Sequence, residues 1–548
     1  MGACHETNAD RTKFIINEDF KIKQALLRTM QSYTTTNYQQ QPRPEEMYYE
    51  KRNLNYYYPK KKIPPRTSTQ TNNKIIIQNK SMLNEVYKTE GRLGEGGYGQ
   101  VYLVRHKKMG LLRAMKVIPV NSQHEEGKTD EEIELLKKLD HPNIVKLFEY
   151  FSDNDKYYLI TEYCKGGDLF ELIRRKKRFS ELSAAYIMYQ IFRSLIYCHN
   201  THHLIHRDIK PENIVVFRVN DEKELYDVKL IDFGISEIFT KLEPNNDYKI
   251  RGSLNYIAPE VLRHKFDEKC DIWSCGVILY ILVIGKYPFV GKDKNEILYN
   301  IEHGNYTFPE EFIEKSSPEI RDLIQQCLKV NPSDRISAKK AIDHPFFLLY
   351  DSEKFFMHVA EAFLIKTINN IKKYKIKNSL QELTFKYLVH NYPNQEEITQ
   401  IYRVFNQFNL NNDGKLTKSE LEKGLLNHLF KGQNIKDKEI AEKETNEIFR
   451  VLDDNNNGYI ECEEFVRAGI DKNLLKNKKS LKFTFDFLDK DRNGQISVDE
   501  LKEVYGIVNA DDEKAMVDLM NSIDKDQDRH ISFDEFYGMM VKIIDGLI

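Results

Sequence analysis

Three stretches, met in chain order, carry residue types that could hold phosphates and move a proton. The first, LGEGGYGQV at residues 93–101, is glycine-rich, and glycines let a backbone approach phosphate oxygens with its N–H groups unhindered. Lys116 follows in AMK, and the stretches HRDIKPEN at 206–213 and DFG at 232–234 add carboxylates and an amide. A glycine-rich turn alone is often only a hairpin, so its meaning depends on the stretches that follow it.

In this order the stretches resemble the signature set of protein kinases, which APE at 258–260 completes. The resemblance implies that Lys116 holds the α- and β-phosphates of ATP and that Glu132 is its ion-pair partner. It also implies that Asp208 accepts the proton of a substrate hydroxyl, while Lys210 steadies the γ-phosphate as in the serine/threonine branch of the family. The implied catalytic residues are Asp208, Lys210, Asn213 and Asp232, of which the last two would also hold Mg²⁺.

The same resemblance defines a nucleotide pocket. Thr161 would line its back, and the backbone of the segment after Thr161 would form hydrogen bonds with the adenine. The residues implied to bind ATP are Leu93, Gly94, Glu95, Gly96, Gly97, Tyr98, Gly99, Gln100, Val101, Ala114, Lys116, Glu132, Glu162 and Cys164.

The competing interpretation of this part of the chain is a pseudokinase, which would keep the fold but lack a catalytic residue; all four catalytic side chains are present. Lys249 stands where many kinases carry an activating phosphosite, so we expect phosphorylation of this loop not to be the main switch. The same resemblance implies that Asp168 and Glu212 favour substrates with a basic residue a few positions before the Ser or Thr. The alternative for both is an ordinary solvated charge near a helix start.

A twelve-residue pattern recurs four times in the C-terminal third, at residues 409–420, 453–464, 489–500 and 524–535. Oxygen-bearing side chains at positions 1, 3 and 5, a backbone carbonyl at 7 and Glu at 12 match the EF-hand loop, which wraps hard oxygen ligands around Ca²⁺. The implied calcium ligands are Asn409, Asn411, Asp413, Lys415 and Glu420; Asp453, Asn455, Asn457, Tyr459 and Glu464; Asp489, Asp491, Asn493, Gln495 and Glu500; and Asp524, Asp526, Asp528, His530 and Glu535.

The four copies differ in ways that should change their affinity for calcium. Asn409 replaces the usual leading Asp, which removes a charge from the first loop. The second loop is charge-poor at Asn455 and Asn457, and the third departs least from the pattern. In the fourth, Arg529 replaces the turn glycine, and a non-glycine residue at positive φ costs roughly 1 kcal/mol. Arg529 also adds a positive charge near the ion.

Composition bounds the other possibilities. With 548 residues, of which 41% are apolar, the chain is long enough for several domains with buried cores. The seven cysteines are scattered without a CxxC pair, which indicates reduced thiols in a cytosolic type of compartment. No apolar run reaches the length of a bilayer span, and the longest candidate, residues 276–285, predicts a core helix.

Charge is spread unevenly, although its net value is only -2. Residues 1–80 carry 14 Lys/Arg against 7 Asp/Glu, whereas residues 391–548 carry 22 against 32. Between these regions, residues 369–389 contain five lysines and one glutamate. We expect one basic amphipathic helix there, because apolar residues recur at helical spacing. Its apolar stripe is Ile376, Leu380, Leu383 and Tyr387, and its basic residues are Lys372, Lys373, Lys375 and Lys377.

A kinase, a basic helix and four EF-hands in this order resemble the calcium-dependent protein kinase family. The implied fold class is multidomain: an α+β bilobal protein kinase fold followed by an all-α module of four EF-hands. The implied parts are a disordered basic tail at 1–80, a kinase domain at 87–347, an autoinhibitory junction at 350–395 and a calmodulin-like domain at 396–545. The implied cofactors are ATP, Mg²⁺ and Ca²⁺, and the implied activity is calcium-switched phosphorylation of protein Ser and Thr hydroxyls.

Three alternatives to this reading stay open at this point. The basic helix could be packed permanently on the kinase lobe instead of moving to an acidic partner. The chain could be a calcium sensor or scaffold that binds partners without phosphorylating them. It could also be a kinase that is regulated elsewhere, with EF-hands that are structural or filled by magnesium.

The N-terminus raises the question of a membrane surface. Gly2 after the initiator Met and the nearby Cys4 are what myristoylation with palmitoylation needs, although Glu6 replaces the usual Ser or Thr. One acyl chain binds membranes only marginally, so a second chain or a basic patch such as residues 60–62 would be required. The alternative is an ordinary tail with a chance glycine. We expect a cytoplasmic monomer with protein substrates, the junction helix as an intramolecular partner and no nucleic acid.

Overall fold

The computed structural model describes most of the chain from residue 79 onward. It covers residue 79 and residues 82–544, with gaps at 97–98, 120–122, 154, 221–222, 235, 239–252, 264–266, 351–360, 375–384, 386, 391–394, 431–434, 454–456, 473–475, 506–516, 518–519 and 522. The predicted acylation sites Gly2 and Cys4 and the basic patch at 60–62 therefore lie outside the described residues. Within the part described, no helix combines the length and apolar character needed to cross a bilayer.

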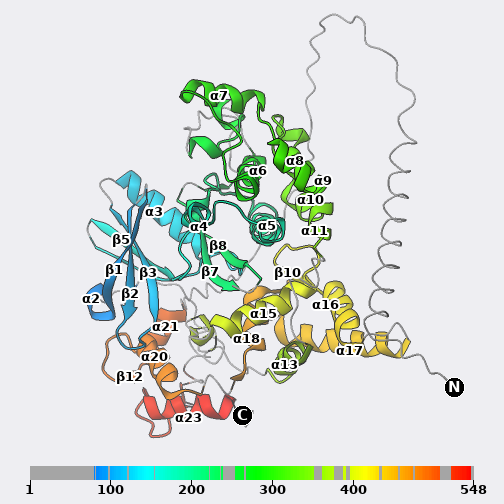
Figure 1. Cartoon of the computed structure of the whole chain (residues 1–548). Helices are drawn as coiled ribbons and strands as arrows, with labels where there is room; N and C mark the ends of the chain where they lie inside the picture. The colour runs from blue at the N-terminus through cyan, green and yellow to red at the C-terminus, as the bar shows by residue number, and fades with distance from the viewer. Residues whose placement is uncertain are drawn as a thin grey trace, which may run out of the picture. The chain divides into compact units, whose positions relative to one another are not determined.

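A five-stranded antiparallel sheet with strand order β1-β2-β3-β5-β4 forms the small lobe (Figure 1). Val104, Met115 and Ile160 lie on one face of this sheet and form a small core with Tyr87 and Phe151. The elements are α2 (Leu83–Val86), β1 (Tyr87–Gly96), β2 (Gly99–His106), β3 (Leu112–Pro119), α3 (Gln123–Leu136), β4 (Leu147–Ser152) and β5 (Lys156–Glu162).

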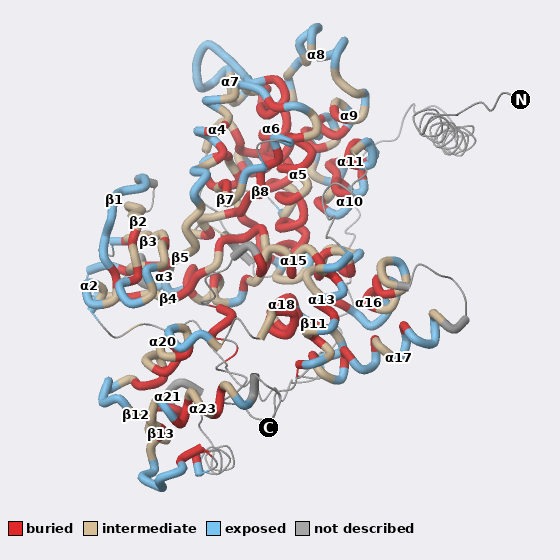
Figure 2. The backbone as a smooth tube through the Cα atoms, turned by 60° about the horizontal axis from the view of Figure 1, so that its bottom comes forward, coloured by how far each residue is buried: buried red, intermediate tan, exposed pale blue. Residues whose placement is uncertain are grey.

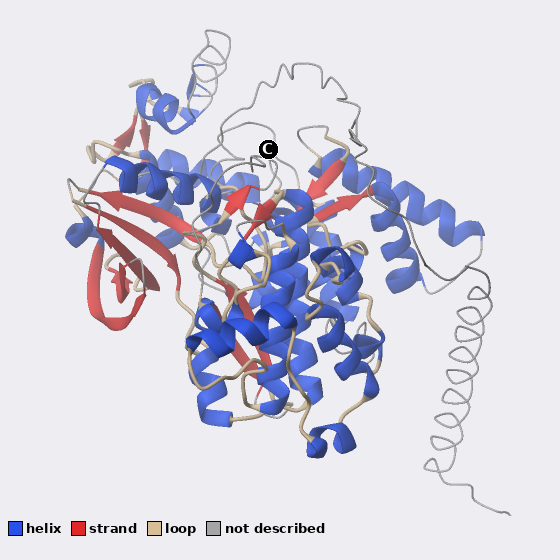
Figure 3. Ribbon diagram, turned by 90° about the horizontal axis from the view of Figure 1, so that it is seen from above, coloured by secondary structure: helices blue, strands red, loops and turns tan. Residues whose placement is uncertain are grey.

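The large lobe is mostly helical, as the sequence predicts (Figure 3). Helix α6 (Lys269–Ile284) is buried along almost its whole length, which confirms the core helix expected at 276–285 (Figure 2). It ends where Gly285 adopts a left-handed φ of 79°.

The other elements of this lobe are α4 (Leu169–Lys176), α5 (Glu181–Ile196), η1 (Tyr197–Thr201), β6 (Leu204–Ile205), η2 (Pro211–Asn213), β7 (Ile214–Asn220), β8 (Leu225–Leu230), β9 (Glu237–Ile238), η4 (Leu254–Tyr256), η5 (Val261–Arg263), α7 (Lys294–His303), α8 (Glu310–Lys315), α9 (Pro318–Cys327), η6 (Pro332–Asp334), α10 (Ala338–Ile342) and α11 (Pro345–Leu348).

Two pairs of helix–loop–helix units follow the kinase lobes, and a short antiparallel strand pair joins the two loops of each pair. In the first pair, Leu416 faces Ile460; in the second, Ile496 faces Ile531. The first pair contains α15 (Gln395–Phe408), β10 (Lys415–Thr417), α16 (Lys418–Leu425), η7 (Leu426–Phe430), α17 (Ile435–Leu452), β11 (Tyr459–Glu461) and α18 (Cys462–Gly469). The second contains α20 (Lys478–Leu488), β12 (Gln495–Ile496), α21 (Val498–Tyr505), β13 (Ile531–Ser532) and α23 (Phe533–Ile544).

The segment between the kinase and the EF-hand pairs contains α13 (Glu361–Lys372), which packs against α15, α17 and α18 (Figure 1). The expectation of one helix over 369–389 is wrong, because the chain leaves helical geometry at Tyr374. Of the predicted apolar stripe, Ile376, Leu380 and Leu383 lie outside the described residues, as do Lys375 and Lys377. Tyr387 is described, and its ring stacks on Phe487 with centroids 3.8 Å apart.

The large lobe and the EF-hand module have separate apolar cores. The buried residues of the kinase core run from Ile118 to Phe347, and the partly buried Tyr350, where the junction begins, packs against them. The second core unites both EF-hand pairs and includes Leu364, Ile368 and Ile371 of α13. The buried face of α13 therefore belongs to the calcium module and not to the kinase lobes.

Candidate active site and calcium loops

The predicted phosphate-binding lysine lies between two carboxylates. Lys116 Nζ is 2.8 Å from Glu132 Oε1 and 2.9 Å from Asp232 Oδ1. Burial alone would lower the pKa of Lys116, but Glu132 and Asp232 together raise it. Burial likewise favours a raised pKa for Asp232, yet Lys116 outweighs it and holds that pKa below its ordinary value. Lys116 and Asp232 are thus both charged at neutral pH.

Three separate elements bring these charges together. Lys116 lies on β3, opposite Val101 of β2 and Leu159 of β5, so the sheet register fixes its direction. Glu132 comes from α3 and is buried. Asp232 follows β8 and has a φ of 65°, a left-handed conformation that persists only where the surroundings impose it.

The catalytic loop predicted from HRDIKPEN is folded around Asp208. Lys210 Nζ lies 2.6 Å from Asp208 Oδ2, and Asn213 Nδ2 donates to the same oxygen at 2.9 Å. Asn213 uses its amide nitrogen in this contact, so its amide oxygen remains for a cation. Asp232 likewise uses Oδ1 in its described hydrogen bonds and leaves Oδ2. Asn213 and Asp232 therefore fit the Mg²⁺ site that the sequence implies.

The sequence analysis missed Asp271, a buried residue that holds the backbone of the catalytic loop in place. Asp271 is 1% exposed and accepts hydrogen bonds from the backbone N–H groups of His206 and Arg207, each at 2.9 Å. The same carboxylate lies 2.9 Å from His199 Nε2. A signal existed, because Asp271 is an acidic residue in the first turn of an otherwise apolar helix, and a buried carboxylate needs such partners.

A second missed residue is Arg335, which forms a buried bidentate pair with Glu260 of the APE stretch. The two distances are 2.6 Å and 2.9 Å. The sequence gives no local sign of this pairing, because the partners are 75 residues apart.

The glycine-rich stretch forms the hairpin between β1 and β2, where Gly96 pairs with Gly99. A Cβ on Gly99 would lie 2.0 Å from the Val117 carbonyl oxygen, so only glycine fits there. Gly97 and Tyr98 lie outside the described residues, as does the side chain of Glu95.

The remaining residues predicted to bind ATP come from β1, β2, β3 and the segment after β5. Ala114 pairs with Thr161 in the sheet, so both lie beside Lys116. The backbone N–H of Glu162 donates to the Lys146 carbonyl at 3.1 Å, so the group that Glu162 can offer to a base is its carbonyl. The other members of this set are Leu93, Gly94, Gln100, Val101 and Cys164.

Two predicted peptide-recognition carboxylates have different roles in the fold. Asp168 caps α4 and accepts a hydrogen bond from the Glu171 N–H at 2.8 Å. Glu212 is exposed beside the catalytic loop. Lys249 of the activation segment lies outside the described residues.

The first two calcium loops show the EF-hand fold. In loop 1, Glu420 accepts from the N–H of Asn411 at 3.3 Å and of Thr417 at 3.0 Å, so its carboxylate closes the loop. The side-chain oxygen of Asn409 is buried and has no hydrogen-bond partner. In loop 2, Asp453 accepts from the N–H of Gly458 at 3.1 Å. Asn455 lies outside the described residues, while Asn411, Asp413, Lys415, Asn457, Tyr459 and Glu464 are described.

Loops 3 and 4 gather carboxylates at the predicted positions. Oxygens of Asp489, Asp491 and Glu500 lie within 4.8 Å of one another, and so do those of Asp524, Asp526 and Asp528. Burial raises the pKa of Asp489, and the neighbouring carboxylates raise it further. Asp489 Oδ1 is buried without a hydrogen-bond partner. A divalent cation fits such a cluster, because it supplies the positive charge that the carboxylates lack.

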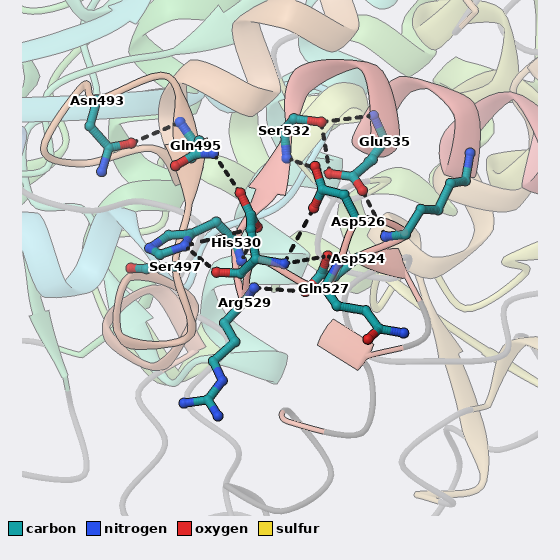
Figure 4. A network of polar contacts seen from close by, with 12 residues as sticks. Asn493, Gln495, Ser497, Asp524, Asp526, Gln527, Arg529, His530, Ser532 and Glu535 are labelled. Atoms are coloured by element: carbon teal, nitrogen blue, oxygen red, sulfur yellow. Dashed lines mark hydrogen bonds and ion pairs between the residues drawn. The ribbon is translucent and has the colours of Figure 1, made fainter.

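The fourth loop keeps its turn despite the missing glycine. Arg529 has a φ of 66°, which confirms that a non-glycine residue takes the left-handed position. Its N–H donates to Asp524 at 2.8 Å, as the Gly494 N–H donates to Asp489 at 3.0 Å in loop 3. The Arg529 side chain points away from Asp524 and Asp526 (Figure 4), so the cost of this residue lies in its backbone.

These features define a protein kinase fused to two EF-hand pairs. The protein kinase domain model matches residues 87–347, and the model of an EF-hand domain pair matches residues 398–468 and 478–541. Both matches agree with the lobes, the ion pair and the paired loops described above.

The relatives carry the same combination. Calcium-dependent protein kinase 4 of Plasmodium falciparum (isolate 3D7) is 38% identical over 478 residues, which cover 86% of this chain and 89% of the relative. Its namesake in Plasmodium berghei (strain Anka) is 38% identical, with the same coverage of both chains. Calcium-dependent protein kinase 5 of Plasmodium falciparum is 35% identical over 86% of this chain and 80% of the relative. The chain belongs to the calcium-dependent protein kinase family and is a Ser/Thr protein kinase.

Proposed function

We propose that the chain transfers the γ-phosphate of ATP to protein Ser and Thr hydroxyls only when calcium fills its EF-hands, and that the junction at 350–395 inhibits the kinase at rest. The observation that carries the proposal is the burial of α13 in the core of the calcium module. A calcium module that binds the junction can remove the junction from the kinase when calcium changes the conformation of the module.

Within the cleft, Asp208 takes the proton of the substrate hydroxyl while Lys210 holds the transferred phosphate. Lys116 binds the α- and β-phosphates, and Glu132 keeps its ammonium group in place. Asn213 and Asp232 would hold magnesium, which would supply the neutralising charge that phosphoryl transfer needs. The 2.6 Å contact between Lys210 and Asp208 supports these roles, because it puts both groups at one point of the cleft.

Ion pairs, in addition to the burial of α13, support binding of the junction by the calcium module. Lys372, at the end of α13, lies 2.5 Å from Glu444 of α17, and Lys366 lies 3.1 Å from Asp471. A basic segment thus meets the acidic module, as its lysines predict. The alternative of a helix packed permanently on the kinase lobe stays open for the rest of the basic stretch, because α13 contains only its first four residues and His390 Nε2 lies 3.3 Å from the Phe148 carbonyl of the small lobe.

Removing everything after Leu348 tests the inhibition. The buried residues of the kinase core end at Phe347, so the truncated chain keeps them and loses the partly buried Tyr350 that packs against them. We expect phosphate transfer to a basic Ser-containing peptide without calcium, at a rate unchanged by a chelator. A truncated chain that folds but is inactive would contradict inhibition by the junction and show that the module is needed for activity.

A pair of full-length variants tests the capture. Ile368 on α13 is 2% exposed, whereas its neighbour Ile365 is 43% exposed. Ile368→Asp should disrupt the packing of α13 on the calcium module, because it buries a charge. The kinase should then stay inactive in calcium. Ile365→Asp adds the same charge on the open face and should leave calcium activation intact. Equal activation of both variants would rule out this contact as the capture site.

We also propose substrates with a basic residue before the Ser or Thr, recognised by the exposed Glu212 and by Asp168. Because Asp168 already caps α4, its contribution would be the smaller one. Peptides that differ only in an Arg or Ala before the Ser test this, with Glu212→Gln as the variant. A preference that survives Glu212→Gln and Asp168→Asn would place recognition elsewhere.

Acylation at Gly2 and Cys4 is a separate proposal that rests on the sequence alone. Labelled myristate should enter the wild-type chain and not Gly2→Ala, and labelled palmitate should need both Gly2 and Cys4. Absence of label from the wild-type chain would refute it.

A further inference from the structure

The tip of the first calcium loop contacts the kinase domain at one turn. The hydroxyl of Thr201 donates to the backbone carbonyl of Asp413 at 2.6 Å. The next residue, Gly414, has a φ of 80°, and a Cβ there would lie 2.6 Å from Cδ2 of Tyr197. The ring of Tyr197 thus lies directly against the loop backbone, where a larger residue has no room.

The kinase side of this contact is held rigidly. Tyr197 and Thr201 are the two ends of η1, a single π-helical turn that extends α5; such turns are uncommon and are frequent at functional sites. Tyr197 is 5% exposed, and its hydroxyl accepts a hydrogen bond from the Asp140 N–H at 3.0 Å. Its ring also stacks on His141, with centroids 5.2 Å apart. The loop therefore meets a preformed surface.

The same turn also holds the catalytic loop. His199, in the middle of η1, lies 2.9 Å from Asp271, and Asp271 binds the N–H groups of His206 and Arg207. Those two residues immediately precede Asp208. One turn of five residues therefore contacts calcium loop 1 on one side and the support of the catalytic loop on the other.

On the loop side, the contact lies among expected calcium ligands. Asp413 and Lys415, which flank Gly414, are the ligands at positions 5 and 7, and the Asp413 carboxylate accepts from the Lys415 N–H at 2.9 Å. Fixing the peptide between Asp413 and Gly414 therefore orders two ligands in advance. Loop 1 has most to gain from such ordering, because Asn409 leaves it without the usual leading charge.

We propose that η1 is the docking surface for calcium loop 1, and that docking on the kinase and filling of this loop stabilise each other. The inference rests on the proposed function and adds to it that the kinase domain sets the calcium affinity of this one loop. The coupling is reciprocal: whatever removes the docking contact weakens calcium binding, and whatever empties the loop weakens docking.

Two variants of Thr201 in the full-length chain test the inference. Thr201→Val removes the hydroxyl and keeps the shape of the side chain, whereas Thr201→Ser keeps the hydroxyl. In a calorimetric calcium titration, we expect Thr201→Val to weaken one site by about twofold to tenfold, which is the range for one hydrogen bond. Thr201→Ser should titrate like the wild type. Thermal melting in chelator checks that both variants are folded.

A second background assigns the affected site. Glu420→Gln disables loop 1, so Thr201→Val should then cause no further change in the titration. An equal change in both backgrounds, or no change in either, would overturn the proposal. Phosphate transfer with and without calcium is measured on the same samples: if it stays calcium-dependent while the titrations do not shift, the docking inference fails and the proposed function stands.

Discussion

The catalytic cleft and the calcium loops treat charge in opposite ways. In the cleft, Lys116 lies between Glu132 and Asp232, so each of these carboxylates has a positive partner within the fold. In loop 3, Asp489 and its neighbouring carboxylates lie together, and one buried oxygen has no hydrogen-bond partner. The cleft thus pairs its carboxylates with a lysine of the chain, whereas loop 3 gathers carboxylates that a cation from outside would balance. The difference is one of balance, because the cleft also offers Asn213 and Asp232 to magnesium.

The largest expected effect comes from a substitution that changes the catalytic cleft and leaves the calcium loops intact. Asp208→Asn should lower phosphate transfer by roughly a hundredfold to ten-thousandfold, because the base can no longer take the proton. Calcium binding, measured by calorimetry, should not change. The exposed Asp343→Asn is a matched control, since it makes the same chemical change away from the cleft. A variant that keeps its activity would exclude Asp208 as the base.

A substitution in calcium loop 3 should do the reverse: it should weaken calcium binding and leave the catalytic cleft unchanged. Glu500 accepts from the N–H groups of Lys490 and Asp491, at 2.7 Å and 3.1 Å, and closes loop 3. Glu500→Gln removes one charged ligand, so calcium affinity at this loop should fall about tenfold to a hundredfold. ATP binding in the absence of calcium should stay as it is. An unchanged number of tight sites in a calcium titration would contradict the assignment of Glu500.

Lowering the pH should weaken calcium binding at loop 3 before it disturbs the catalytic cleft, and the difference should be moderate. Burial and the neighbouring carboxylates raise the pKa of Asp489, so the ion-free loop takes up a proton at a higher pH than an ordinary aspartate would, and protons compete with calcium there as the pH falls into the acid range. The lowered pKa of Asp232 gives the opposite result. Its ion pair contributes stability above the unfolded value of about 3.9 and loses it only as pH falls through the lower folded value.

Calcium affinity and ATP affinity should therefore respond differently over this range. The measurement is a pair of titrations at pH 7, 6 and 5, one with calcium and one with ATP and magnesium. Calcium binding should weaken first. A parallel decline of both affinities would show that the two sites do not differ in the way that their charges indicate.

The smallest expected effect concerns the backbone of loop 4. Arg529→Gly removes a left-handed non-glycine residue, worth about 1 kcal/mol, and should tighten calcium binding by about fivefold. The reverse change in loop 3, Gly494→Arg, should weaken that loop by a similar factor. If Gly494→Arg leaves the calcium affinity of loop 3 unchanged, a left-handed non-glycine residue at this position does not weaken a calcium loop, and the expected cost in loop 4 is refuted.

The sequence predicted both kinds of site because each depends on short, ordered motifs. Lys116, Asp208 and Asp232 lie far apart in the chain, yet each stands in a local stretch that identifies it. The four calcium loops are recognisable for the same reason, since all ligands of a loop fall within twelve residues.

The parts that the sequence did not reveal are contacts between distant elements. No sequence pattern near Thr201 predicts its contact with Asp413, which lies 212 residues later. The end of α13 at Lys372 was also missed, because apolar spacing continues past the residue where helical geometry stops. Periodicity reports which residues could share a helix face, and tertiary packing decides where the helix ends.

The short strand pairs between the loops have a consequence for the response to calcium. Leu416 pairs with Ile460, and Ile496 pairs with Ile531, so the two loops of each pair share one backbone ladder. We expect an ion that orders one loop to order its neighbour as well, so that the second ion binds more readily than the first. Calcium entry would then be cooperative, and the response to calcium would have a threshold in place of a gradual rise.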